Sequence, residues 1–430
     1  MHVQDLRLTF FLFILKLLGG FPYFIEEKSI PERTVQQESN TNSTRLNKVI
    51  TLKQSRFWYC WSITVILGVI IFALNATYGM FFLSDSVLQW FRSNTFVLAF
   101  KVDETCATIF VSLMVIYITR RGSLLMKLTL FLVKMFEHVD IPLMRPYCFG
   151  QIMLPMTAIS VGTTVQVICY VALNSAASNT NLRLRIPEII VAYLINVSLV
   201  GFFAWLVYLL CRFYASVIHD LLSISEEKKK NKDCLNIETG GGNILRIAGL
   251  DQTAEIPPAI FNYRFLAVQR KLYNGIEFKK LLNEYFGFIV VIFMLYLIFS
   301  CILASFIISN VSSTNPISLT MAGAYVVNTV IPLVAVPMVT RLTDEKIEDM
   351  RLISRRLQYD PIFRSERTQF RDILRLMQRT PPFNICNLFI LNRGLIINVF
   401  GFIATYLIIL LQFSFIEGTS PSEGIQSVDV

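Results

Sequence analysis

Seven long apolar stretches alternate with polar segments along the chain. A helix needs about 20 apolar residues to cross the roughly 30 Å hydrocarbon core of a bilayer, and each stretch meets that length. The pattern therefore predicts an all-α protein with seven transmembrane helices. The expected spans are residues 57–82, 95–119, 150–174, 187–211, 284–309, 317–340 and 392–414.

The basic residues indicate which way these helices face. All but four of the 39 Lys and Arg residues lie before the first span or in the segments that follow the second, fourth and sixth spans. The exceptions are Arg92, Lys101, Arg183 and Arg185. Because Lys and Arg concentrate in cytoplasmic loops, and because seven is odd, we expect a cytoplasmic N-terminus and an extracellular C-terminus.

The spans divide the chain into five regions. Residues 1–56 form a cytoplasmic N-terminal region, and residues 57–340 hold the first six spans. Residues 341–391 form cytoplasmic anchor helices, residues 392–414 the seventh span, and residues 415–430 an extracellular tail.

The first region contains an apolar stretch, residues 8–25, that resembles a signal peptide. Asp5 precedes the stretch, Lys16 interrupts it, and no small-residue cleavage site follows it. We therefore expect a retained helix that lies in or dips into the inner interface of the membrane.

Residues 343–357 have the charge order of a cytoplasmic helix. Acids come first and bases last, which suits the helix macrodipole: Asp344, Glu345, Glu348 and Asp349, then Arg351, Arg355 and Arg356. Together with the apolar face of the next helix, this segment is expected to form a layer that associates subunits beneath the membrane. The alternative is that these basic helices rest on anionic lipid headgroups.

The composition supports a membrane protein. The chain is 54% hydrophobic and 16% charged, with a mean hydropathy of +0.55, whereas soluble domains carry about a quarter charged residues. The net charge of +9 is spread between apolar stretches rather than gathered on one basic domain. This distribution argues against a soluble enzyme and against a nucleic-acid partner.

Signatures of catalysis and metal binding are absent from the sequence. His2, His138 and His219 are far apart, and HExxH, Walker and GxSxG motifs do not occur. The eight cysteines are scattered without a CxxC pair. We expect no enzyme activity, no cofactor, no metal site and no disulfide framework.

The last span carries the most informative pattern. Small and polar residues recur at alternating spacings of four and three, which places them on one helical stripe: Gly394, Asn398, Gly401, Thr405, Ile408 and Gln412. Polar side chains are costly against lipid. The stripe therefore either bonds to neighbouring helices or lines a water-filled path shared between subunits.

The same span resembles insect gustatory receptors, which belong to the insect chemoreceptor superfamily. Residues 405–413 read Thr-Tyr, five hydrophobic residues, Gln-Phe, which matches the signature of that family at all nine positions. Residues 17–23, Leu-Leu-Gly-Gly-Phe-Pro-Tyr, are similar to the Gly-Phe-Pro segment near the start of its members.

The resemblance implies a ligand-gated cation channel. Such a receptor is a homotetramer in which the final helices surround a pore, while the other six spans of each subunit enclose a pocket open to the outside. The resemblance places Gln412 and Phe413 at the gate, where a ring of Phe413 side chains would exclude water and a small rotation would bring Gln412 into its place. The residues expected at the pore or gate are Asn398, Thr405, Tyr406, Ile408, Gln412 and Phe413.

The ligand pocket is expected in the outer halves of spans two to six. Polar and aromatic residues there are Asp103, Glu104, Gln166, Tyr170, Tyr193, Asn196, Tyr325 and Asn328. As a set they describe aromatic walls with few charges, suited to a small neutral or weakly basic organic molecule. Helix-to-helix bonding is the alternative role for each. Asn310, in the sequon Asn310-Val311-Ser312, is a candidate glycosylation site.

The resemblance leaves the stimulus open. Members of the sugar branch often have Glu after the Thr-Tyr pair, whereas this chain has Leu407. A bitter plant compound is therefore favoured over a sugar such as fructose. The location implied is the plasma membrane of gustatory dendrites, with lipid, permeating cations and co-expressed receptor subunits as further partners.

Three other classes of membrane protein share parts of this pattern. An odorant receptor subunit is compatible with the pattern. A G-protein-coupled receptor would have the opposite orientation, and its Asp-Arg-Tyr and Asn-Pro-x-x-Tyr motifs are absent. A secondary transporter would show paired broken helices, whereas Pro332 and Pro337 interrupt the sixth span alone.

Overall fold

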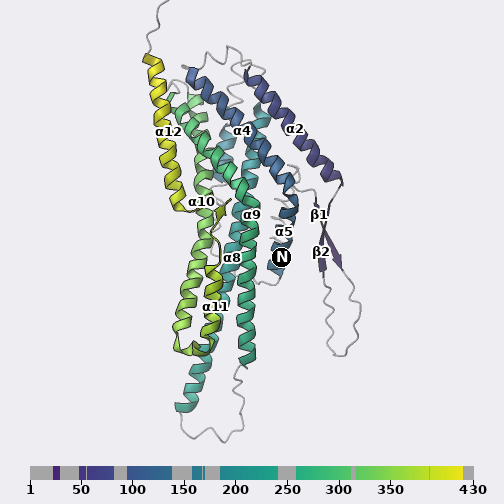
Figure 1. Cartoon of the computed structure of the whole chain (residues 1–430), viewed down its shortest axis with the longest axis vertical. Helices are drawn as coiled ribbons and strands as arrows, with labels where there is room; N and C mark the ends of the chain where they lie inside the picture. The colour runs from purple at the N-terminus through teal and green to yellow at the C-terminus, as the bar shows by residue number, and fades with distance from the viewer. Residues whose placement is uncertain are drawn as a thin grey trace, which may run out of the picture.

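The structure is a computed structural model in which long helices run side by side along one axis (Figure 1). It describes residues 23–29, 48–54, 56–81, 94–137, 157–166, 168–169, 185–240, 258–310, 316–386 and 388–419. Helices dominate this described part of the chain, which confirms the all-α class.

The helices are named by their order in the chain. Their bounds are α2 Arg56–Phe81, α4 Asn94–Arg120, α5 Gly122–Glu137, α8 Arg185–Gly240, α9 Pro258–Asn310, α10 Pro316–Tyr359, the 3-10 helix η1 Pro361–Glu366, α11 Arg367–Gln378 and α12 Arg393–Thr419. Six of the seven expected spans fall on these helices. The third expected span, 150–174, is described only at residues 157–166 and 168–169, where it is helical.

Three helices are far longer than a bilayer is thick. Helices α8, α9 and α10 contain 56, 53 and 44 residues, and at 1.5 Å per residue the longest extends about 84 Å. Each of the three helices continues beyond its apolar segment through charged sequence. The expected continuation of the fourth span over residues 212–225 and the approach to the fifth span over residues 272–283 lie within α8 and α9.

Within the described residues, four helices have the length and hydropathy to cross a membrane. They are Val200–Lys230, Tyr263–Phe306, Gly323–Tyr359 and Arg393–Phe413. A fifth candidate is the pair Thr105–Arg120 and Gly122–Leu132, which is bent by 62° between its two parts. Exposed apolar side chains on α2, among them Phe57, Leu67 and Ile71, form a surface suited to lipid.

Helix α9 is the centre of the packing. It contacts α4, α5, α8, α10, α11 and α12. Close approach to α8 depends on Gly275, because a Cβ there would lie 2.8 Å from the ring of Tyr214 and 3.1 Å from the ring of Phe213. Both rings are fully buried, so these two α8 side chains pack directly on the backbone of α9 at Gly275.

Two short β-hairpins accompany the helices and were not expected. Strand β1 (Tyr23–Ser29) pairs antiparallel with β2 (Lys48–Gln54), and β3 (Asn384–Ile385) pairs with β4 (Phe389–Ile390). Tyr23–Ile25 forms the start of β1 and not the end of the expected interfacial helix, so that part of the prediction is wrong. Aromatic and β-branched residues concentrate in both strands, which favours pairing over a helix. Residues 8–22 of the expected helix lie outside the described residues.

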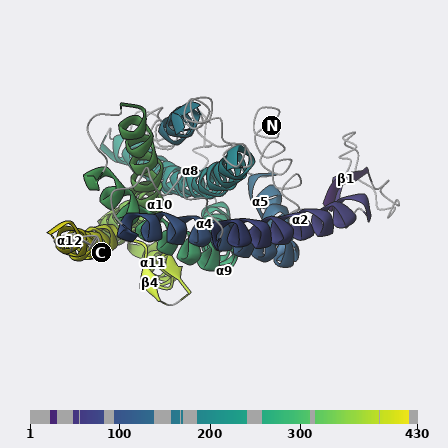
Figure 2. The same ribbon diagram turned by 90° about the horizontal axis from the view of Figure 1, so that it is seen from above.

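Helix α12 lies at one edge of the molecule and the β1–β2 hairpin at the opposite edge (Figures 1 and 2). Helices α8, α9 and α10 lie between them. Helix α11 runs beside the C-terminal half of α10 and the N-terminal half of α9 and leads through the β3–β4 hairpin into α12.

Candidate functional site

Helix α12 has one packed face and one open face. Val399 and Ile403 are buried against the bundle, with Leu395 and Leu410 packed against the same core and Leu407 packed against Leu303 and Phe306. Only 11% of its most apolar segment is buried, compared with 72%, 67% and 50% for the corresponding segments of α8, α9 and α10. The other three helices are therefore embedded in the subunit, whereas α12 rests on its outside.

The polar stripe lies on the open face. Helical geometry sets it opposite the packed residues, and every residue of the stripe from Gly394 to Gln412 is exposed. The hydroxyl of Thr405 donates to the carbonyl of Gly401 at 2.9 Å, within the same helix. The side chains of Asn398 and Gln412 form no hydrogen bond to another described residue. The stripe is thus left uncovered by the described part of the chain.

All six residues expected at the pore or gate are exposed within the subunit: Asn398, Thr405, Tyr406, Ile408, Gln412 and Phe413. Phe413 is 58% exposed, a high value for a large aromatic side chain. The ring of Tyr406 lies 4.4 Å from that of Phe402.

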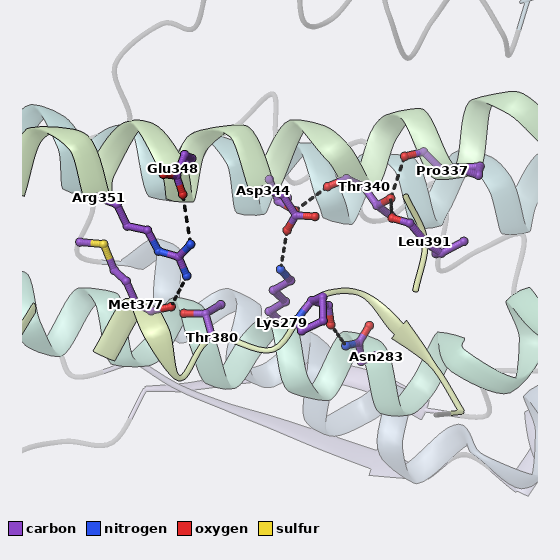
Figure 3. A network of polar contacts seen from close by, with 12 residues as sticks. Lys279, Asn283, Pro337, Thr340, Asp344, Glu348, Arg351, Met377, Thr380 and Leu391 are labelled. Atoms are coloured by element: carbon purple, nitrogen blue, oxygen red, sulfur yellow. Dashed lines mark hydrogen bonds and ion pairs between the residues drawn. The ribbon is translucent and has the colours of Figure 1, made fainter. Parts of the chain in front are cut away.

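The base of α12 is held by a network of side chains from α9 and α10 (Figure 3). The connection from α11 to α12 is mostly irregular, so its carbonyls need donors from elsewhere. Asn283 donates its Nδ2 hydrogen to the carbonyl of Pro382 at 3.1 Å. Thr340 approaches the carbonyl of Leu391 at 3.3 Å. Asn392 caps α12, accepting a hydrogen bond from the amide of Leu395 at 3.1 Å.

Lys279 is the buried charge of this network. Its side chain is 1% exposed, and its Nζ lies 2.9 Å from Oδ1 of Asp344, which is 42% exposed. The same ammonium sits 4.6 Å from the centre of the Phe383 ring. Phe383 in turn meets Phe203 of α8 edge-on. Ion pair and cation–π contact together offset the cost of removing the lysine from water.

Arg351 holds the end of α11. One guanidinium nitrogen donates to the carbonyl of Met377 at 3.0 Å, and the other lies 3.1 Å from Glu348. A cation at a helix C-terminus also suits the helix dipole. Beside it, α9, α10 and residues 380–382 enclose a cleft of about 480 Å³ that contains charges of both signs.

Two residues expected to bind ligand are brought together at the N-terminal half of α10. Asn328 donates its Nδ2 hydrogen to Oε1 of Gln166 at 2.9 Å. Its Oδ1 is buried without a partner among the described residues. Gly162 makes this contact possible, because a Cβ there would lie 2.5 Å from that oxygen. Tyr325 is half-buried one turn earlier on α10.

The other expected pocket residues are not brought together by the described structure. Asp103 and Glu104 belong to α4, and Tyr193 and Asn196 to α8, but their side chains lie outside the described residues. Tyr170 and the last two residues of the sequon also lie outside them, while Asn310 ends α9.

Sequence reasoning missed the network at the base of α12. A signal was present, because Lys279 occupies a position on the apolar repeat of α9 that continues through Leu282, Phe286 and Ile289. A lysine on an otherwise buried stripe requires a partner. Nothing in the local pattern marked Thr340 or Phe383, whose partners are distant in the sequence.

Comparison with known proteins identifies the family. The model of the family described as 7tm chemosensory receptor matches residues 8–417. The chain belongs to this family. Membership makes it a multi-pass membrane receptor rather than an enzyme. No curated protein matches the sequence.

Two solved structures share the fold of this receptor. Both are of the insect olfactory receptor OR5 from Machilis hrabei, one in complex with eugenol and one without it, with TM-scores of 0.64. Sequence identity is 12% and 11%, over 96% of this chain and 99% of the olfactory receptor. At such low identity the likeness establishes the fold alone.

Removing Asp344 should destabilise the protein more than removing an exposed acid of the same helix. Asp344→Ala leaves the buried Lys279 without its counter-ion, and we expect a loss of about 1–3 kcal/mol. Asp349→Ala, which breaks only the exposed pair with Lys346, should change stability by less than about 0.5 kcal/mol. Thermal unfolding in detergent measures both.

The double variant Lys279→Met/Asp344→Leu provides the control. It removes both charges and keeps apolar volume beside Phe383, so its stability should lie near that of the wild type. Equal losses for Asp344→Ala and Asp349→Ala would contradict a structural role for the buried pair.

Proposed function

We propose that this receptor is a gustatory ligand-gated cation channel in which four copies place α12 around a central pore. The observation that carries the proposal is the open polar stripe of α12, on a helix that otherwise has the apolar character of a membrane span. Around a shared axis, Asn398, Thr405 and Gln412 would meet water instead of lipid, which removes the cost of exposing them to hydrocarbon.

The gate of this channel is Phe413, at the outer end of α12. Its ring is exposed on the flank of the stripe, one residue beyond Gln412. Four such rings would form an apolar constriction that excludes water and therefore ions. A small rotation of α12 exchanges the phenyl ring for the amide of Gln412 and lets water return.

The ligand is a small organic tastant that binds from outside. Tyr325, Asn328 and Gln166 supply an aromatic wall and amide groups on the outer half of the bundle. The buried Oδ1 of Asn328 is an acceptor available to a ligand hydroxyl or amine. A bitter plant compound fits this chemistry, and a sugar such as fructose is the second candidate.

An odorant receptor subunit is the alternative function. It is favoured by the fold shared with OR5, one of whose structures holds eugenol. The signature at residues 405–413 favours the gustatory assignment. Under either assignment the receptor belongs at the plasma membrane of a chemosensory neuron, with dendrites of gustatory neurons as the proposed site.

Orientation can be tested with epitope tags at the two ends. The distribution of Lys and Arg predicts that antibody applied to intact cells stains a C-terminal tag and not an N-terminal tag. Permeabilised cells, where both tags should stain, are the control. Staining of the N-terminal tag alone on intact cells would reverse the orientation and favour the G-protein-coupled arrangement.

Phe413→Ala should raise current in the absence of any ligand, because it removes the apolar ring that excludes water. Whole-cell recording from cells that express this chain alone measures the effect, with surface labelling to normalise for expression. Phe400→Ala is the matched control, since Phe400 is an exposed aromatic residue on the opposite flank of the stripe and about 20 Å deeper. A silent Phe413→Ala variant at normal surface density would remove Phe413 from the gate.

Tyr325→Ala should shift the concentration of agonist needed for half-maximal current by about tenfold, because it removes one aromatic wall of the pocket. Maximal conductance per channel should be unchanged. Leu352→Ala, an exposed position on the cytoplasmic half of α10, serves as the control. Unaltered potency for every agonist found in a screen of bitter compounds and sugars would show that the pocket lies elsewhere.

A further inference from the structure

Helix α10 connects the proposed ligand-binding residues to the base of α12. Its outer half carries Tyr325 and Asn328, and its cytoplasmic half contacts the base of α12. Pro332 and Pro337 lie inside the helix between these regions. Proline has no N–H, so neither residue can donate to the carbonyl four positions earlier, and the helix is easier to bend there.

Thr340 follows directly after this weak section. It is fully buried, and its hydroxyl oxygen lies near two carbonyls. The carbonyl of Pro337, in the same helix, is 2.8 Å away. The carbonyl of Leu391, in the connection that enters α12, is 3.3 Å away. A threonine hydroxyl has one hydrogen, so it can donate fully to only one of the two acceptors at a time.

The second acceptor belongs to the start of α12. Leu391 is buried, and its amide donates to the carbonyl of Phe383 at 2.9 Å. The next residue, Asn392, caps α12. A change in the bond to Leu391 therefore acts on the first turn of α12, only two residues before the helix begins at Arg393.

We propose that Thr340 is a positioning residue for gating, whose single hydroxyl hydrogen is shared between the proline-weakened section of α10 and the base of α12. Bending of α10 at Pro337 alters which carbonyl receives the hydrogen. The hydrogen bond from Thr340 to Leu391 then changes in strength, and the resting position of α12 changes with it. This inference rests on the proposed function, because it assigns Thr340 a part in opening the channel.

Thr343 offers a matched control on the same helix. It is also a fully buried threonine, and its hydroxyl donates to the carbonyl of Thr340 at 2.7 Å, within α10. The two residues therefore share side chain, burial and a bond to the carbonyl three positions earlier. They differ in the contact from Thr340 to Leu391.

The test compares three variants for current in the absence of ligand and for hydrogen exchange in the purified protein. Thr340→Val keeps the shape of the side chain and removes the hydroxyl, so we expect ligand-independent current to rise about fivefold, the factor that one hydrogen bond contributes to an equilibrium. Amides of residues 391–397 should exchange faster. Thr343→Val should leave the current and the exchange rates unchanged. Thr340→Ser, which retains a hydroxyl, should also show the wild-type current and exchange rates.

Phe413→Ala, recorded in parallel, separates failure of this inference from failure of the proposed function. If Phe413→Ala conducts while Thr340→Val and Thr343→Val both behave as the wild type, the channel stands and the role of Thr340 is overturned. If amides 391–397 exchange faster in Thr340→Val but its current equals that of the wild type, the contact is structural only and the gating role of Thr340 is overturned. If Phe413→Ala is silent at normal surface density, the proposed gate fails and the gating role of Thr340 fails with it.

Discussion

The connection between α11 and α12 imposes the constraint around which the packing of α9, α10 and the base of α12 is organised. It is largely irregular just before α12 begins, and its carbonyls need donors that a helix does not supply. The exposed carbonyl of Pro382 accepts from Asn283 and the buried carbonyl of Leu391 from Thr340, while Arg351 adds a donor to the carbonyl of Met377 in the last turn of α11. The same side chains that satisfy the backbone also fix the position of α12.

Burial of Lys279 belongs to this arrangement. The buried side chain of Lys279 projects from α9, and its ammonium ends between Asp344 of α10 and Phe383 of the connection. One charged group thereby joins three segments that are distant in the sequence. A buried ion pair adds little to stability when compared with apolar packing, but it permits few alternative arrangements of its neighbours.

Much of the fold follows from hydropathy. Apolar length places α2, α4, α10 and α12 to within about two residues at their starts, because the cost of unsatisfied backbone groups in lipid leaves few alternatives to a helix. The extension of α8 and α9 far beyond their apolar segments was only partly expected, since packing between long helices stabilises polar sequence that has no strong signal of its own. Strand β1 was missed because an apolar run of a few residues suits either structure.

The functional residues also divide into those that a local sequence pattern predicts and those whose contacts are distant in the sequence. A periodic stripe on one helix can be read from spacing, and the stripe on α12 was found. Contacts such as that from Thr340 to Leu391 span 51 positions, and a single sequence contains no local pattern that reports them.

Gly162 and Asn328 illustrate how such contacts bear on receptor diversity. The amide of Asn328 occupies the space that any side chain at position 162 would need. A larger residue at 162 is therefore tolerable only if 328 becomes smaller or turns away, and the acceptor it presents is then lost. A replacement at position 162 therefore alters the acceptor that Asn328 presents, so one substitution would change the chemical preference of such a receptor at a residue it does not replace.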